Sequence, residues 1–92
     1  MKSIMSNDKS CYVCGRETNL HKHHIFGGAN RKISERYGCW VYLCAYHHNM
    51  SYEGVHFNRD LDLKLKESCQ MIWEQRFEGR SEFRRIFGKS WI

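Results

Sequence analysis

The sequence predicts a small α+β domain that is stabilised by a bound metal ion and carries additional helices toward its C-terminal end. The chain has 92 residues, and a chain this short buries too small a fraction of its surface to be secure without a bound metal or a disulfide. Two pairs of Cys and His residues stand at the short spacing of zinc knuckles. Strand-like alternation in the first half gives way to helical periodicity after residue 58.

Two strands are expected in the first half of the chain. Residues 18–26 alternate between two faces and end at Gly27-Gly28, while residues 39–43 (CWVYL) are β-branched and aromatic. Residues 1–10 show no periodicity. We therefore expect a flexible N-terminal arm over residues 1–10, followed by a single domain over residues 11–92.

Helices are expected at residues 30–37, at residues 45–52, from Asn58 onward and at residues 82–87. Asn30 is a suitable N-cap for the first, Gly38 a suitable residue after its end, and Ser81 a suitable cap for the last. The third helix carries apolar residues at helical spacing, which we interpret as a core stripe. The stripe consists of Leu61, Leu65, Cys69 or Ile72, and Phe77.

The charge, the cysteine content and the distribution of apolar residues limit the classes of protein to which this chain can belong. The net charge is +5 and the pI is near 9.1, which suits a polyanionic partner such as nucleic acid but is also common in other small domains. The cysteine count is odd and the first residues are polar, so metal in a reducing cytoplasm is favoured over disulfides. No membrane association is expected, because no long apolar run, basic amphipathic helix or lipidation signal is present.

The sharpest motif is Cys11-X2-Cys14 paired with Cys44-X2-His47. Two knuckles that each present two ligands can close a tetrahedron around zinc, and a Cys3His site of this kind is closed and structural. Gly15 allows the first knuckle to fold back. The two remaining cysteines are less favoured as zinc ligands. Cys39 competes with Cys44 for the site, whereas Cys69 lies on the apolar helix and is assigned to the core.

A second group of histidines remains outside this predicted zinc site. Adjacent strand residues point to opposite faces, so His23 can bind a metal while His24 is directed elsewhere. Hydrolysis of a phosphodiester needs this division, with a metal to polarise the phosphate and a neutral imidazole to deprotonate water. His48 can present a further imidazole to that metal. His21 shares the face of His23 as a weak ligand, a phosphate contact or an ordinary strand residue.

The ordered set of Cys-X2-Cys, His23-His24-Ile25 and Leu43-Cys44-X2-His47-His48 resembles the HNH endonucleases, whose core is a zinc-stabilised ββα-metal (His-Me finger) fold. The stretch from His23 to His56 is most similar to small HNH proteins of bacteriophages and prophages. The resemblance covers about half of the chain, from Cys11 to about His56.

The resemblance implies a role for each residue of the set. His23 and His48 would bind the catalytic metal, with His56 as a further candidate ligand, and His24 would act as general base. The central Asn of the family is missing at its usual place, which holds Gly38, Cys39 and Trp40. Asn30 is the replacement we expect, and Asn49 is a poorer one.

The expected function is therefore metal-dependent hydrolysis of DNA phosphodiester bonds, as nicks or double-strand cuts of low sequence specificity. The expected cofactors are a structural zinc ion and a catalytic divalent metal, either Mg²⁺, Mn²⁺, Ni²⁺ or Zn²⁺. Arg31, Lys32 and Arg36 either grip phosphates or form a solvated face. RNA remains an alternative substrate, and a monomer or weak dimer is expected. The alternative function is a non-catalytic zinc-ribbon module that binds nucleic acid.

Overall fold

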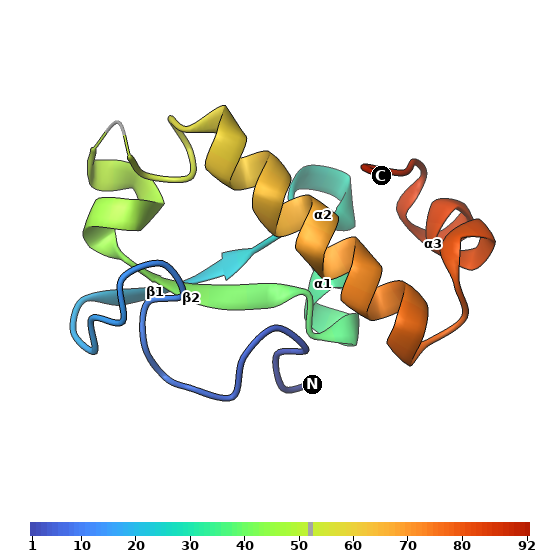
Figure 1. Ribbon diagram of the computed structural model, residues 1–92, viewed down its shortest axis with the longest axis horizontal. Helices are drawn as coiled ribbons and strands as arrows, with labels where there is room; N and C mark the ends of the chain where they lie inside the picture. The colour runs from blue at the N-terminus through green and yellow to red at the C-terminus, as the bar shows by residue number, and fades with distance from the viewer. Residues whose placement is uncertain (52) are drawn as a thin grey trace.

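A two-stranded antiparallel sheet lies at the centre of the protein, with its longest helix crossing over it (Figure 1). The computed structural model describes residues 1–51 and 53–92. Strand β1 (Leu20–His24) pairs with β2 (Trp40–Cys44), so that Leu20 lies opposite Cys44 and His24 opposite Trp40. Both strands were expected, although β1 is shorter than predicted and β2 begins one residue later. The α+β class predicted from the sequence is confirmed.

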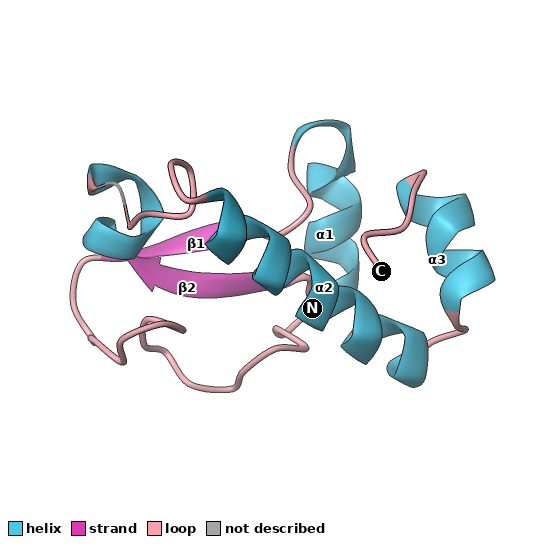
Figure 2. Cartoon of the chain, turned by 45° about the horizontal axis from the view of Figure 1, so that its top comes forward, coloured by secondary structure: helices cyan, strands magenta, loops and turns pink. Residues whose placement is uncertain are grey.

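Helices connect the strands and form the second half of the molecule (Figure 2). Between the strands lie η1 (Gly28–Asn30) and α1 (Arg31–Tyr37); after them come η2 (Tyr46–Met50), α2 (Arg59–Arg76) and α3 (Arg80–Phe87). Among the described residues, no helix combines the length and the apolar character needed to cross a membrane.

Two of the predicted helices differ from those observed. The helix expected over residues 45–52 is a single π-helical turn, η2, and its predicted last residue, Tyr52, lies outside the described residues. The last helix begins at Arg80 rather than after a Ser81 cap, because the chain turns at Gly79 with φ at 88°. Helix α2 was expected from Asn58 onward, and Asn58 is its N-cap, since its side chain accepts a hydrogen bond from the Leu61 N–H at 3.1 Å.

Aromatic side chains join α2 and α3 to the residues that follow β1. Phe26 contacts Phe83, with ring centroids 5.4 Å apart, and Phe83 stacks on Phe87 at 4.3 Å. Trp73 of α2 is 1% exposed and packs on Phe83. The expected stripe is buried at Leu65 and Cys69 and half-buried at Leu61, Ile72 and Phe77. Trp73, which the predicted stripe omitted, is the largest fully buried side chain.

Helix α1 is fastened to the end of β1 by a buried serine. The Ser34 hydroxyl donates to the Phe26 carbonyl at 2.7 Å and accepts from the Phe26 N–H at 3.2 Å. The Ser34 carbonyl in turn accepts from the Cys39 N–H at 2.8 Å, just before β2. Asn30 occupies the N-cap position of α1 but makes no side-chain cap; its amide donates to the Phe87 carbonyl at 2.9 Å. Asn30 is therefore the N-cap residue of α1, as expected, but its side chain bonds to the end of α3 instead of capping α1.

The first residues of the chain, expected to form a flexible arm, lie along the start of β2. The Ile4 N–H donates to the Gly38 carbonyl at 2.9 Å, and the indole of Trp40 donates to the Met1 carbonyl at 3.2 Å. The Ser3 hydroxyl also donates to the Trp40 carbonyl. Gly38 is essential to this approach, since a Cβ atom there would lie 2.2 Å from the Lys2 carbonyl oxygen.

Replacing Gly38 with Ala is expected to lower the free energy of unfolding by about 1–3 kcal/mol. Its φ of 73° disfavours any residue with a Cβ, and the added methyl group would displace the backbone of Lys2. Gly27→Ala is the matched control, because a Cβ there meets nothing within 4 Å and its φ is −92°. Urea unfolding of both variants measures the difference; equal stabilities would show that the close approach at Gly38 is unimportant.

Candidate functional site

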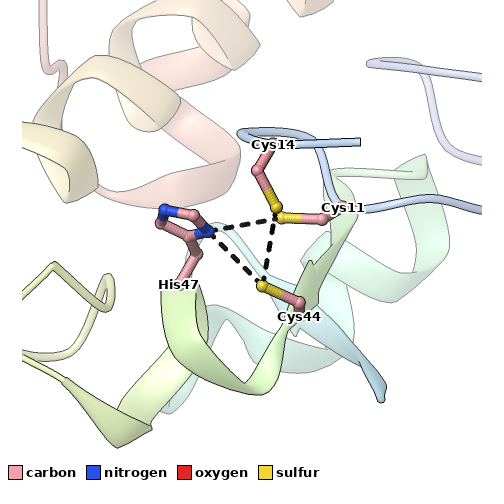
Figure 3. A group of neighbouring side chains, drawn as sticks. All are labelled: Cys11, Cys14, Cys44 and His47. Atoms are coloured by element: carbon pink, nitrogen blue, oxygen red, sulfur yellow. Dashed lines mark hydrogen bonds between the residues drawn. The ribbon is translucent and has the colours of Figure 1, made fainter. Parts of the chain in front are cut away.

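The four residues of the predicted zinc site converge on one point (Figure 3). The Cys14 and Cys44 sulfur atoms are 3.8 Å apart, and His47 Nδ1 lies 3.4 Å from the Cys44 sulfur and 3.8 Å from the Cys11 sulfur. All four ligand atoms lie within 4.8 Å of one another. Zinc–sulfur bonds of about 2.3 Å at tetrahedral angles separate two sulfur atoms by about 3.8 Å. The cluster can therefore hold a metal ion such as zinc.

Backbone N–H groups prepare this cluster for a cation. Burial raises the pKa of the Cys11 thiol, but hydrogen bonds from the backbone of Cys44, Cys14 and Val13 outweigh it and lower that pKa to about 6. Cys11 is 2% exposed and Cys44 is 1% exposed, whereas Cys14 lies at the surface. The thiolate is the form that binds metal, so the environment of Cys11 favours the ligating state at neutral pH.

The sheet places the two knuckles together. The Tyr12 N–H donates to the Tyr42 carbonyl at 2.8 Å, which ties the first knuckle to β2. Cys44 is the last residue of β2, and His47 stands on the η2 turn directly after it. Cys39 and Cys69 are fully buried in the core, and a hydrogen bond with Cys39 together with burial raises the pKa of Cys69. The expected preference for Cys44 over Cys39 agrees with this geometry.

A second cluster consists of His23, His48 and His56, whose ligand atoms also lie within 4.8 Å of one another. The rings of His23 and His48 have centroids 5.4 Å apart, and those of His23 and His56 are 5.6 Å apart. The Nε2 atoms of His48 and His56 face each other at 3.1 Å. Three elements supply these side chains: β1, η2 and the segment before α2.

The environment of this cluster lowers the pKa of two of its imidazoles. Burial, followed by the neighbouring His48 and His56, lowers the pKa of His23 to about 4, and burial also lowers the pKa of His48. His23 is 8% exposed, and its buried Nε2 has no hydrogen-bond partner among the described residues. A buried nitrogen without a partner is costly. A cation bound between the three rings would satisfy it.

Two features hold the ring of His48 and the segment that carries His56. His21 Nδ1 lies 2.8 Å from His48 Nδ1, which leaves His48 Nε2 directed into the cluster. The His56 N–H donates to the His48 carbonyl at 3.2 Å. This approach requires Gly54, because a Cβ there would meet the His48 carbonyl oxygen at 2.9 Å. His21 therefore contacts a member of the cluster without being one of its three residues.

His24 points away from this cluster and meets a carboxylate on α1. Its Nε2 lies 2.8 Å from Glu35 Oε1, and the other carboxylate oxygen accepts a hydrogen bond from Lys22 Nζ at 2.9 Å. The Lys22 ammonium also lies 4.2 Å from the centroid of the Trp40 ring. Lys22 and His24 share one face of β1 because they are two residues apart. Chiefly the Lys22 hydrogen bond, and then His24, lower the pKa of Glu35 to about 2.

An open cleft of about 430 Å³ brings these groups to one place, since His23, His24, His48 and His56 all line it. Its cations are Lys22, Arg31 and Lys66. Lys22 is paired with Glu35 and Lys66 with Asp62, whereas Arg31 has no ion pair among the described residues. Lys32 and Arg36 are exposed and do not line the cleft.

Comparison with family models, curated proteins and solved structures finds no match for this chain. The site must therefore be interpreted from its own geometry.

The structure does not bring Asn30 to the histidines, because its amide is bound to the Phe87 carbonyl at the end of α3. The residue that contacts His24 is Glu35, which the sequence reasoning missed. One signal was available: Glu35 is the only acidic residue in the otherwise basic segment of α1. His21 was interpreted as an ordinary strand residue in preference to a weak ligand or phosphate contact, and its observed partner is the ring of His48.

We expect one tightly bound zinc ion per chain at Cys11, Cys14, Cys44 and His47. Cys44→Ser should abolish stoichiometric zinc and the cooperative thermal transition, because the free energy of zinc binding is largely folding free energy. Cys69→Ala is the control, since Cys69 is buried outside the cluster; it should keep zinc while losing about 1–2 kcal/mol of stability. Elemental analysis and calorimetry measure both. A native-like melt after complete chelation would contradict the prediction.

Replacing Lys22 with Met should raise the pKa of the Glu35 carboxyl from about 2 toward its ordinary value of 4.5. The reason is that the hydrogen bond from Lys22 stabilises the ionised carboxylate. A titration of the side-chain carboxyl carbons by NMR gives this pKa directly. Glu82, which pairs with Arg85 instead, serves as the internal reference and should titrate unchanged. An unaltered Glu35 titration would remove Lys22 as the cause.

Proposed function

We propose that this protein is a metal-dependent endonuclease that hydrolyses DNA phosphodiester bonds, of the HNH type that its Cys and His pattern resembles. One observation carries the proposal: three imidazoles converge around a buried nitrogen that has no partner among the described residues, and a fourth imidazole held by a carboxylate lines the same cleft. A purely structural zinc module has no use for this second group of histidines.

The second cluster fits a divalent ion. His23, His48 and His56 would hold it, and among the expected metals their all-nitrogen donor set favours Zn²⁺ or Ni²⁺ over Mg²⁺ or Mn²⁺. Such an ion would supply Lewis-acid stabilisation of a phosphoryl oxygen and of the leaving oxygen. Burial favours the neutral, metal-binding form of two of these ligands, since it lowers the pKa of His23 to about 4 and also lowers that of His48. The two strands, η2 and the two ligand clusters would then correspond to a zinc-stabilised ββα-metal core.

His24 is the general base in this proposal. It lies next to His23 in the chain but on the opposite face of β1, so it does not compete for the ion. Its side chain is 13% exposed and lines the cleft, so water can reach it. A neutral imidazole at this place can take a proton from a water molecule that attacks phosphorus.

Arg31 is the phosphate contact that the charge pattern favours. It lines the cleft and has no ion pair among the described residues, so its guanidinium can meet a phosphate without first breaking a salt bridge. Lys32 and Arg36, exposed on the same helix, can add contacts to the backbone outside the cleft. Contacts to the phosphate backbone do not distinguish one base from another, which agrees with cleavage of low sequence specificity.

A plasmid-nicking assay on two variants tests the proposal. His24→Ala should lower the rate by on the order of 10²- to 10⁴-fold, the usual contribution of a positioned base, while both metals and DNA affinity are retained. His48→Ala should lose both cleavage and the second metal but keep the structural zinc, because His47 and His48 belong to different clusters.

Metal content and a DNA-binding measurement accompany the rates as controls. A wild-type protein that bound DNA without cutting it under any divalent metal would instead be the non-catalytic zinc-ribbon module. Full activity in His48→Ala would remove His48 from the site. Cleavage of RNA at a rate equal to that of DNA would assign the same chemistry to the other nucleic acid.

A further inference from the structure

We infer that Glu35 fixes the ring proton of His24 on Nε2, so that Nδ1 is the nitrogen that accepts the proton from water. Glu35 is thereby a positioning residue for the proposed base. The catalytic meaning of this inference rests on the proposed nuclease function, whereas the position of the proton is a property of the protein alone.

Hydrogen-bond chemistry determines the tautomer. A carboxylate has no proton to donate, and Glu35 is ionised at any pH well above 2. Its Oε1 lies 2.8 Å from His24 Nε2, so the proton in that hydrogen bond must belong to His24. A neutral imidazole carries a single ring proton. The lone pair of neutral His24 is therefore on Nδ1, the only other ring nitrogen.

Lys22 determines which oxygen of the Glu35 carboxylate faces His24. Its ammonium occupies Oε2 at 2.9 Å and is itself held over the Trp40 ring, so Oε1 alone is left for His24. The helix that carries Glu35 is anchored by the adjacent Ser34, which is fully buried and bonded to both backbone groups of Phe26. An exposed ion pair such as Lys22–Glu35 adds little to the stability of the fold. Only a small free-energy difference is needed, however, to favour one ring tautomer of His24 over the other.

The substitution Glu35→Gln gives the sharpest test, because the amide is isosteric but has one acceptor and one donor. Lys22 can only donate, so it should capture the amide oxygen and leave the NH₂ group facing His24 Nε2. That nitrogen must then accept, which moves the ring proton to Nδ1 and blocks the base. The loss in cleavage rate should match that of His24→Ala, on the order of 10²- to 10⁴-fold.

The double variant Lys22→Met, Glu35→Gln should reverse this effect. Without Lys22 the amide can turn its oxygen toward His24, which restores the proton to Nε2 and most of the rate. Lys22→Met alone should keep the wild-type tautomer, since the carboxylate still accepts. Glu82→Gln is the matched control, because Glu82 is another carboxylate in a salt bridge, with Arg85, and does not line the cleft.

Nitrogen-15 NMR of the imidazoles in the zinc-loaded protein identifies the protonated nitrogen without any assay of cleavage. We expect a proton on His24 Nε2 in the wild type, on Nδ1 in Glu35→Gln, and on Nε2 again in the double variant. An unchanged tautomer in Glu35→Gln would overturn the inference. If the tautomer moves as expected while the wild-type protein cleaves nothing, the positioning by Glu35 stands and the proposed function fails.

Discussion

The cluster of Cys11, Cys14, Cys44 and His47 is the constraint on which the remainder of the site depends. Its ligand atoms come from two segments that are distant in the sequence, residues 11–14 and 44–47, and lie within 4.8 Å of one another. Thiolates gathered at this distance repel one another unless a cation lies between them. Binding of a metal ion here would therefore be one process with the folding of this end of the sheet. His48 directly follows the ligand residue His47, so the geometry of the first cluster also determines where His48 lies.

The second cluster presents the opposite electrostatic problem. Three imidazoles that share one space cannot all be protonated, and burial of His23 opposes its charging further. At 3.1 Å, His48 Nε2 and His56 Nε2 can share a hydrogen bond when one ring donates and the other accepts. The buried Nε2 of His23 has no such partner among the described residues. A folded protein tolerates a buried polar atom of this kind where the cost is recovered by binding a cation or a substrate, so His23 is the member of the cluster that argues for function.

The sequence predicted the parts that depend on spacing and failed where distant segments meet. Knuckle spacing located Cys11 and Cys44 in one cluster, and alternation correctly separated His23 from His24. Asn30 was expected near the histidines as the replacement for the central Asn of the HNH family, but its amide meets Phe87, 57 residues away. The contact of Glu35 with His24 depends on how α1 lies against β1. Nothing in local patterning specifies that angle, which the buried Ser34 sets.

The pleat of β1 explains how two kinds of histidine chemistry can share one cleft. Residues 21 and 23 face η2, while residues 22 and 24 face α1. Each face then supplies its own partners: imidazoles on one side, and a carboxylate with an ammonium group on the other. A carboxylate among the three imidazoles would bind the cation more tightly and would oppose its action on an anionic phosphate. Placing Glu35 behind His24 instead keeps that negative charge on the far side of the proposed base. Residues from both faces of β1 line one cleft, so both sets of groups would be open to the substrate of the proposed nuclease.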